Sequence, residues 1–188
     1  MLTDAAGAPL ANAVLLVDGV PASPQGAYLM DQVDRQFTPH VLVVPVGAQV
    51  EFPNSDDVRH HVYSFSETKP FELRLFKGLE APPVTFDRPG TVVLGCNIHD
   101  AMLGYILITT SPRFAVSDAS GRISLPDLPA GRWPVSWWHP SQFQQAPVAL
   151  GEVDLGQQGL ALSLPVTPEV AAPEPTLSPL QQRFKSVQ

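Results

Sequence analysis

Residues 86–110, FDRPGTVVLGCNIHDAMLGYILITT, give the clearest indication of fold in this chain. A Pro-Gly turn at 89–90 precedes an apolar run that ends at Cys96, and a short polar loop separates that run from a second one, residues 102–110. Apolar runs of this length that alternate with turn residues are typical of neighbouring β-strands. We therefore expect two strands here, joined by a loop of a few residues.

The rest of the chain repeats this pattern. The sequence has 21 prolines in 188 residues, and they recur between short apolar runs such as 41–46 and 50–52. Proline is disfavoured inside helices and inside central strands, so frequent prolines divide a chain into short strands and turns. No stretch shows a sustained 3.6-residue periodicity. The sequence predicts an all-β protein, and it leaves residues 67–81 open as a loop, a short helix or an edge strand.

Charge and composition exclude some functions. The formal net charge is −7, which argues against a nucleic-acid partner. No apolar run approaches the length of about 18 residues that a membrane span needs, so we expect no membrane span. The first residues, MLTDAAGAPL, lack the basic and apolar regions of a signal peptide. The protein is therefore expected to be cytoplasmic, or to be exported by a signal that this chain lacks.

The loop between the two predicted strands contains three side chains that bind transition metals. Cys96, His99 and Met102 follow one another at three-residue intervals, and Cys96 is the only cysteine. A thiolate and an imidazole suit zinc or copper, whereas a thioether suits copper far better than zinc. Each of these residues alone could simply belong to the core. Their coincidence in one loop favours a metal site, and Met102 favours copper over zinc.

A complete copper site needs a second imidazole from elsewhere in the chain. The stretch 56–65, DDVRHHVYSF, supplies His60 and His61 at the start of a predicted strand. Two imidazoles, one thiolate and a weak axial thioether are the ligands of blue-copper electron-transfer sites. Because neighbouring side chains of a strand point to opposite faces, we expect only one of the two histidines to bind.

Residues 28–111 resemble the cupredoxins, the plastocyanin, pseudoazurin and amicyanin group. The stretch FTPHVLVVPVGAQVEFPNSD is similar to their first long hairpin, HHV to their His-Asn-Val, and FDRPGTVVLGCNIHDAM to their Pro-Gly strand and ligand loop. The two-residue gaps on both sides of the loop histidine are similar to the short amicyanin-type loop. The resemblance implies a Greek-key β-sandwich with one type 1 copper ion per chain, bound by His60, Cys96, His99 and Met102.

The sequence departs from the family at several positions. His60 is favoured as the first ligand because Val62 then takes the place of the family's valine. His61 falls at the family's asparagine, which normally ties the two ligand loops together by hydrogen bonds. His61 could take over that role through a ring N–H, or it could be the ligand itself in a shifted strand. Asn97 and Ile98 replace the usual polar residue and proline, which leaves the hydrogen bonding to the sulfur, and hence the reduction potential, open.

The flanking segments resemble a second β-sandwich. LTDAAGAPLANAVLLVDG and VSDASGRISLPDLPAGRWPVSWWHP are similar to the opening strands and to the second half of carboxypeptidase regulatory-like modules. The resemblance implies one discontinuous domain, residues 1–20 and 113–165, with the cupredoxin domain, 28–111, inserted in it or fused to it. Alternatively, both flanks are extra strands packed on the cupredoxin domain. The proline-rich residues 166–188 predict a flexible tail.

A type 1 copper site implies a one-electron carrier that cycles between Cu(II) and Cu(I). We expect no enzymatic activity, because such a site leaves no position for a substrate. Electrons would pass through the exposed edge of His99 to or from a redox partner protein, such as a cytochrome c or another electron donor or acceptor. Two other functions stay open: a copper carrier or sensor, and a structural interaction module with a vestigial site.

The resemblance also bears on location. Cupredoxins of this kind are typically exported, so it implies a periplasmic protein whose signal peptide is not present in this chain. Proteins with this double architecture are often labelled methylamine utilisation proteins, a label from which we infer no activity on methylamine.

Overall fold

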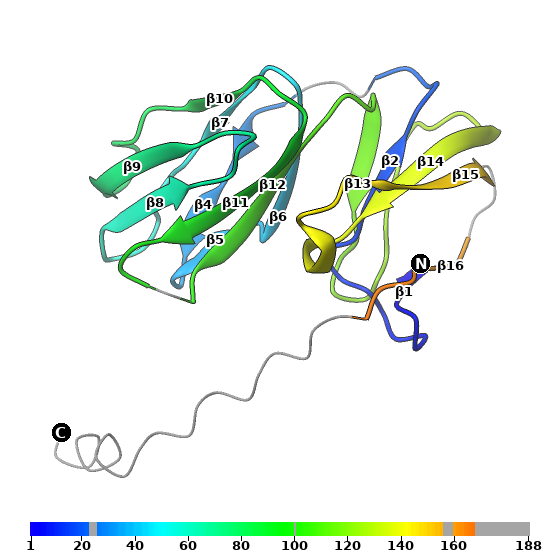
Figure 1. Cartoon of the computed structure of the whole chain (residues 1–188), viewed down its shortest axis with the longest axis horizontal. Helices are drawn as coiled ribbons and strands as arrows, with labels where there is room; N and C mark the ends of the chain where they lie inside the picture. Colours follow the sequence, from blue (N-terminus) through cyan, green and yellow to red (C-terminus); the bar gives the residue numbers. More distant parts are fainter. Residues whose placement is uncertain (23–25, 100, 156–159, 168–188) are drawn as a thin grey trace, which may run out of the picture.

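The computed structural model describes residues 1–22, 26–99, 101–155 and 160–167. Figure 1 shows these residues as two bodies of β-strands, one formed by the middle of the chain and one by its first strands together with its later part. Within the described residues the only helix is a single 3₁₀ turn, Pro140–Gln142. The predicted all-β class is therefore confirmed. No described helix is long and apolar enough to cross a membrane.

The first body is a sandwich of two sheets. Its strands are β3 (Tyr28–Leu29), β6 (Val41–Pro45), β7 (Ala48–Glu51), β8 (His60–Ser64), β9 (Phe71–Phe76), β10 (Val84–Phe86), β11 (Gly90–Cys96) and β12 (Leu103–Thr109). One sheet has the order β6-β12-β11-β8-β9, and the other has the order β10-β7-β3. β11 pairs antiparallel with β12 on one side and with β8 on the other, whereas β12 pairs in parallel with β6. The central position of β11 places the end of this strand next to the start of β8.

Strand periodicity decides which side chains fill this sandwich. Burial alternates along β7, β8 and the second half of β11, as expected for strands with one face toward a core. The inward side chains of both sheets form one buried cluster that includes Val50, Val62 and Val92. Cys96 and Met102 belong to the same cluster. The two sulfur-containing side chains are thus held in the core rather than on a loose surface loop.

A small hairpin lies beside the first sandwich and contributes to the site. It consists of β4 (Asp31–Val33) and β5 (Gln36–Thr38), which pair antiparallel. The two residues between these strands, Asp34 and Arg35, have φ angles of 52° and 58°. Tight two-residue turns with positive φ at both positions match the right-handed twist of the strands they connect. This turn fixes the Arg35 backbone N–H, which donates a hydrogen bond to Asp56.

The second body joins segments that lie far apart in the sequence. Its strands are β1 (Leu2–Thr3), β2 (Val14–Val17), β13 (Arg113–Val116), β14 (Arg132–Trp138), β15 (Val148–Asp154) and β16 (Leu162–Ser163). The main sheet has the order β13-β2-β14-β15, and β1 pairs in parallel with β16. β2 is therefore hydrogen-bonded on both sides to strands about 100 residues further along the chain. A separate apolar cluster, which includes Leu2, Leu15 and Trp137, fills this body.

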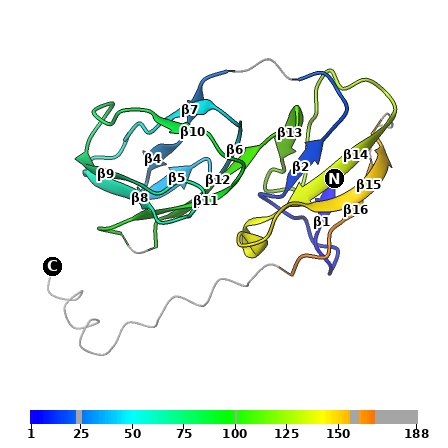
Figure 2. The same cartoon turned by 45° about the horizontal axis from the view of Figure 1, so that its top comes forward.

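A third apolar cluster joins the two bodies, which lie side by side in both views (Figures 1 and 2). Val41, Val43 and Tyr105 from the first body pack with Leu16 and Trp138 from the second. The rings of Tyr105 and Trp138 meet edge to face, with centroids 6.0 Å apart. Aromatic pairs of this geometry stabilise a contact beyond the area that they bury.

The structure settles one element that the sequence left open. Within residues 67–81 it forms β9, an edge strand of the five-stranded sheet. The domain boundaries proposed from the sequence stay predictions. The predicted tail lies mostly outside the described residues, which end at 167, and Val166 near its start is buried against the second body.

Candidate metal centre

His60 opens β8 and points into the first sandwich. Its side chain is completely buried, as are those of Val62 and Ser64 further along the same strand, whereas His61 and Tyr63 face outward. This alternation follows from the two-residue repeat of a strand. A shift in the pairing with β9 lies between His60 and Val62.

Three of the four predicted ligands meet at the end of the central strands. Cys96 Sγ lies 3.5 Å from His60 Nδ1 and 3.9 Å from His99 Nδ1. One donor atom from each residue falls within 4.8 Å of the others, and the two imidazole centroids are 5.1 Å apart. Both rings therefore turn the same type of nitrogen toward one sulfur. Such a cluster of a thiol and two imidazoles can close around a single ion.

Met102 lies next to this cluster. Its side chain is 1% exposed and belongs to the same buried cluster as Cys96. The Met102 N–H donates to the His99 carbonyl oxygen at 2.9 Å, so the loop folds back on itself between the two residues. Met102 thus occupies a buried position at the end of the ligand loop, and a thioether is a suitable ligand for a soft ion.

His61 lies outside the cluster. Its Nε2 is 2.7 Å from Glu72 Oε1 on the neighbouring strand β9, on the outer face of the sheet. The connection between the two ligand segments is instead made by the main chain, because the Asn97 N–H donates to the His61 carbonyl oxygen at 3.1 Å. The structure therefore brings His60, and not His61, to Cys96 and His99.

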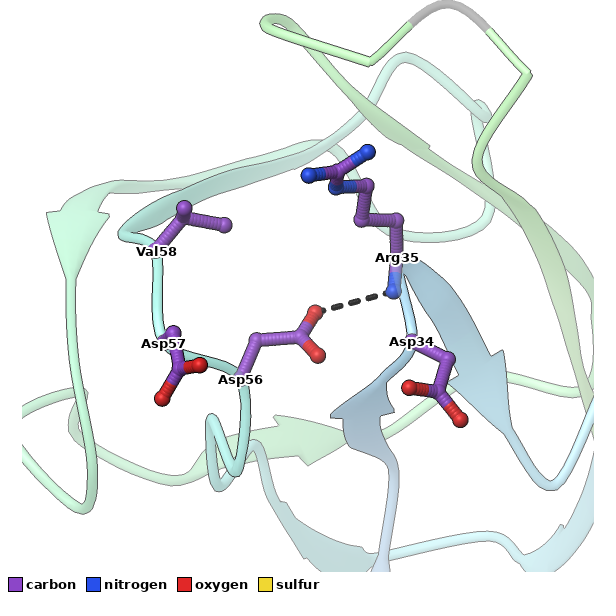
Figure 3. A pocket seen from close by; sticks show the side chains of 5 residues that line it. All are labelled: Asp34, Arg35, Asp56, Asp57 and Val58. Carbon is purple, nitrogen blue, oxygen red and sulfur yellow. Dashed lines mark hydrogen bonds between the residues drawn. The ribbon is translucent and has the colours of Figure 1, made fainter.

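The sequence analysis missed Asp56. Its Oδ2 lies 2.6 Å from His60 Nε2. The Arg35 N–H donates to the same oxygen at 3.0 Å, as Figure 3 shows. Because an ionised carboxylate can only accept, Nε2 carries a proton, and in the neutral imidazole the lone pair then lies on Nδ1, toward Cys96. Partial burial raises the pKa of the Asp56 carboxyl, but the hydrogen bonds from Arg35 and His60 outweigh it and leave the pKa below its usual value. The only sequence signal was an acidic residue four positions before a histidine.

Asn54 holds the segment that carries Asp56. Its Nδ2 donates to the carbonyl oxygens of Val58 and Phe76, both at 2.9 Å, and its Oδ1 accepts from the Asp56 N–H at 3.0 Å. The side chain is 3% exposed, so these bonds are shielded from water. The carboxylate behind His60 is therefore fixed by a buried amide on one side and by the β4–β5 turn on the other.

The centre is partly open on the His99 side. His99 is half-buried, whereas Ile98 and Leu103 on either side of the ligand loop are 48% and 43% exposed. The imidazole of His99 thus lies between a buried thiol and an exposed apolar rim.

A pocket of about 280 Å³ adjoins Asp56, and its lining includes Asp34, Arg35 and Val58 (Figure 3).

The donor set fits copper. A thiolate, two imidazoles that turn Nδ1 toward it and a buried thioether match the preferences of copper in both common oxidation states, while zinc would leave the thioether without a role. Three of these donors, His60, Cys96 and Met102, are buried in the sandwich, and His99 is half-buried at its edge.

No model of a known protein family matches the sequence, and no curated protein matches it. Among solved structures, an oxidised amicyanin variant is similar at 22% identity and a TM-score of 0.40, over 52% of this chain and 99% of that one. A purple cupredoxin from Nitrosopumilus maritimus is similar at 20% identity and a TM-score of 0.39, over 45% of this chain and 100% of that one. The copper-containing nitrite reductase of Thermus scotoductus SA-01 is similar at 27% identity and a TM-score of 0.42, over 57% of this chain but only 28% of the reductase chain.

Proposed function

We propose that this chain binds one copper ion as a type 1 centre and serves as a one-electron carrier. The observation that carries the proposal is the convergence of His60 Nδ1, Cys96 Sγ and His99 Nδ1 within 4.8 Å of one another. Met102, buried beside them, supplies the fourth donor. When bound, the copper supplies a reversible change between Cu(II) and Cu(I).

The protein's own contribution is to keep the donors still. Cys96 ends the central strand β11 and pairs with β8, and His60 begins β8 and pairs with β9, so the sheet holds the backbone at both residues. Asp56 and the Arg35 N–H hold the His60 ring from behind. A donor set that hardly moves lowers the rearrangement that accompanies a change of oxidation state, and this favours fast transfer.

We further propose that His99 is the side of contact with the redox partner. Its ring is half-buried, and the exposed side chains of Ile98 and Leu103 give an apolar rim suited to brief, weak docking. The partner would be a cytochrome c or another protein electron donor or acceptor. We place this exchange in the periplasm, and we propose a carrier rather than an enzyme because the four donors belong to the protein and leave no ligand position for a substrate.

Titration of the purified metal-free protein with Cu(II) tests this function. The proposal requires one equivalent of copper, an intense thiolate-to-copper absorption band, retention through dialysis and reversible one-electron reduction. Cys96→Ser is the matched control, because it removes the thiolate with little change of volume. A weakly coloured and labile site would instead indicate a copper carrier or sensor, and a protein that loses copper on dialysis would have a vestigial site.

A further inference from the structure

The outer face of β8 carries a row of aromatic rings that the metal centre does not use. His61, Tyr63 and Phe65 follow one another at the two-residue spacing of a strand. The centroids of Tyr63 and Phe65 are 4.9 Å apart, and those of His61 and Tyr63 are 6.5 Å apart. Phe65 is 85% exposed. A large exposed ring packed against a second ring at an interplanar angle of 39° is a feature of binding surfaces rather than of solvated sheet faces.

A glycine on the next strand allows this arrangement. Gly95 pairs with Tyr63 across β11 and β8. A Cβ at position 95 would lie only 2.7 Å from Tyr63 Cζ, a separation that atoms do not tolerate. The Tyr63 ring therefore lies close against Gly95 in β11, directly before Cys96. Tyr63 is half-buried, so part of its side chain remains exposed.

These rings line a pocket of about 500 Å³, within the range of about 300–1,000 Å³ that is usual for small-molecule sites. The lining combines aromatic and polar groups. It includes His61, Tyr63, Phe65, Pro70, Glu72 and Asn97. A planar ring could stack on the aromatic side chains, while the polar groups at the edge set its orientation.

The charge in this pocket is balanced. Glu72 Oε1 lies 2.7 Å from His61 Nε2, and Glu72 Oε2 accepts from Arg74 Nε at 3.0 Å. Arg74 holds the pKa of this carboxyl below its usual value, so the group stays ionised at neutral pH. Because Arg74 already neutralises the carboxylate, a cationic ligand gains little here. Each carboxylate oxygen still has a lone pair that can accept a hydroxyl proton.

We propose that this pocket binds a neutral, planar aromatic molecule with hydroxyl groups, of the phenol or hydroquinone class. Its ring packs against Tyr63 and Phe65, and its hydroxyl donates toward Glu72 or Asn97. The site goes beyond the proposed copper function and does not depend on it, since no copper ligand lines the pocket. Its position is nevertheless close to the metal centre, because Asn97 directly follows Cys96 in the chain.

Binding is tested on the metal-free protein, so that the outcome is independent of copper. Hydroquinone is titrated into the protein and followed by calorimetry and by changes in the amide NMR signals. We expect saturable binding, with the largest shifts at Tyr63, Phe65 and Asn97. Phe65→Ala should weaken binding by about two- to tenfold, as expected for the loss of one stacked ring. Leu79→Ala is the matched control, because Leu79 is 79% exposed and does not line the pocket.

Two further probes test the chemistry of the ligand. The dimethyl ether of hydroquinone keeps the ring but has no hydroxyl proton, so it should bind more weakly than hydroquinone. Benzylammonium carries a positive charge and should also bind more weakly. The proposal is overturned if hydroquinone shows no saturable binding, if Phe65→Ala and Leu79→Ala bind it equally well, or if the ether or the cation binds as tightly as hydroquinone.

Discussion

Asp56 Oδ2 lies 2.6 Å from His60 Nε2, while Nδ1 of the same ring faces Cys96 Sγ at 3.5 Å. The carboxylate fixes which nitrogen carries the proton and so leaves the other as a metal donor. It also places a negative charge behind the ligand. This contact links a loop residue to the metal centre through one imidazole, and it makes the role of Asp56 testable.

Replacing Asp56 by asparagine should weaken copper binding and raise the reduction potential. The substitution keeps the shape but removes the charge that favours the more positive ion, and loss of such a partner typically costs about 10- to 100-fold in metal affinity. Competition with a chelator and voltammetry measure the two effects. Asp57→Asn makes the same charge change at an exposed neighbour, where water screens it. Equal behaviour of the two variants would show that the contact with His60 has no influence.

Replacing the two adjacent histidines should have opposite effects on the thiolate-to-copper absorption band. His60→Ala removes a buried donor 3.5 Å from the sulfur and should abolish the thiolate-to-copper band. His61→Ala removes a ring that faces Glu72 on the outer surface and should leave the band in place. The visible absorption of both variants after copper loading shows which of the two histidines is the ligand. The reverse result would mean that β8 is shifted by one residue in solution.

Met102→Leu should raise the reduction potential without unfolding the protein. The change replaces the weak axial thioether, which tunes the potential of such sites. It conserves volume, so the free energy of unfolding should fall by less than about 1.5 kcal/mol. Met30→Leu is the matched control, because Met30 is also fully buried in the same cluster. If the two variants have the same potential, Met102 is core filling and not a ligand.

The contact between the two bodies should contribute strongly to stability. Trp138 is fully buried and packs on Tyr105 across the contact. Trp138→Ala should lower the free energy of unfolding by about 3–5 kcal/mol, as measured by urea denaturation. Trp133 is only half-buried, so Trp133→Ala should cost less. A smaller loss for Trp138 than for Trp133 would contradict the packing described here.

Acid should destabilise the metal-free protein through His139. Burial lowers the pKa of this side chain, against the opposing effect of its hydrogen bond to the Ala11 carbonyl. Its Nδ1 also accepts from the Ser141 N–H at 3.1 Å, which a protonated ring cannot do. A proton therefore binds His139 more readily in the unfolded chain than in the folded protein. The free energy of unfolding should fall as pH drops below the ordinary histidine pKa of about 6.5. Urea unfolding at pH 7.5 and 5.5 measures this loss, which should be smaller in His139→Asn; an equal loss in both proteins would exclude His139 as its source.

Local patterns in the sequence were sufficient for β8 and for the strands β11 and β12 on either side of the ligand loop, but not for the short strands β3, β4 and β5. The spacing of Cys96, His99 and Met102 placed three donors in one turn, and strand alternation required that only one of His60 and His61 point inward. The sequence could not show that Asp56 reaches His60, because this contact depends on the path of the loop between them. Nor could it show that Gly95 receives the ring of Tyr63, because that depends on how β8 and β11 pair. The sequence left the edge strand β9 open because its apolar and polar residues do not alternate regularly, and its burial in the structure is irregular as well.

X-ray absorption at the copper edge of the loaded protein tests the central claim most directly. The account predicts two imidazole nitrogens and one short copper–sulfur bond, and it predicts that this bond is absent in Cys96→Ser. Copper surrounded by oxygen and nitrogen alone in the unmodified protein, or a short copper–sulfur bond that survives Cys96→Ser, would contradict it.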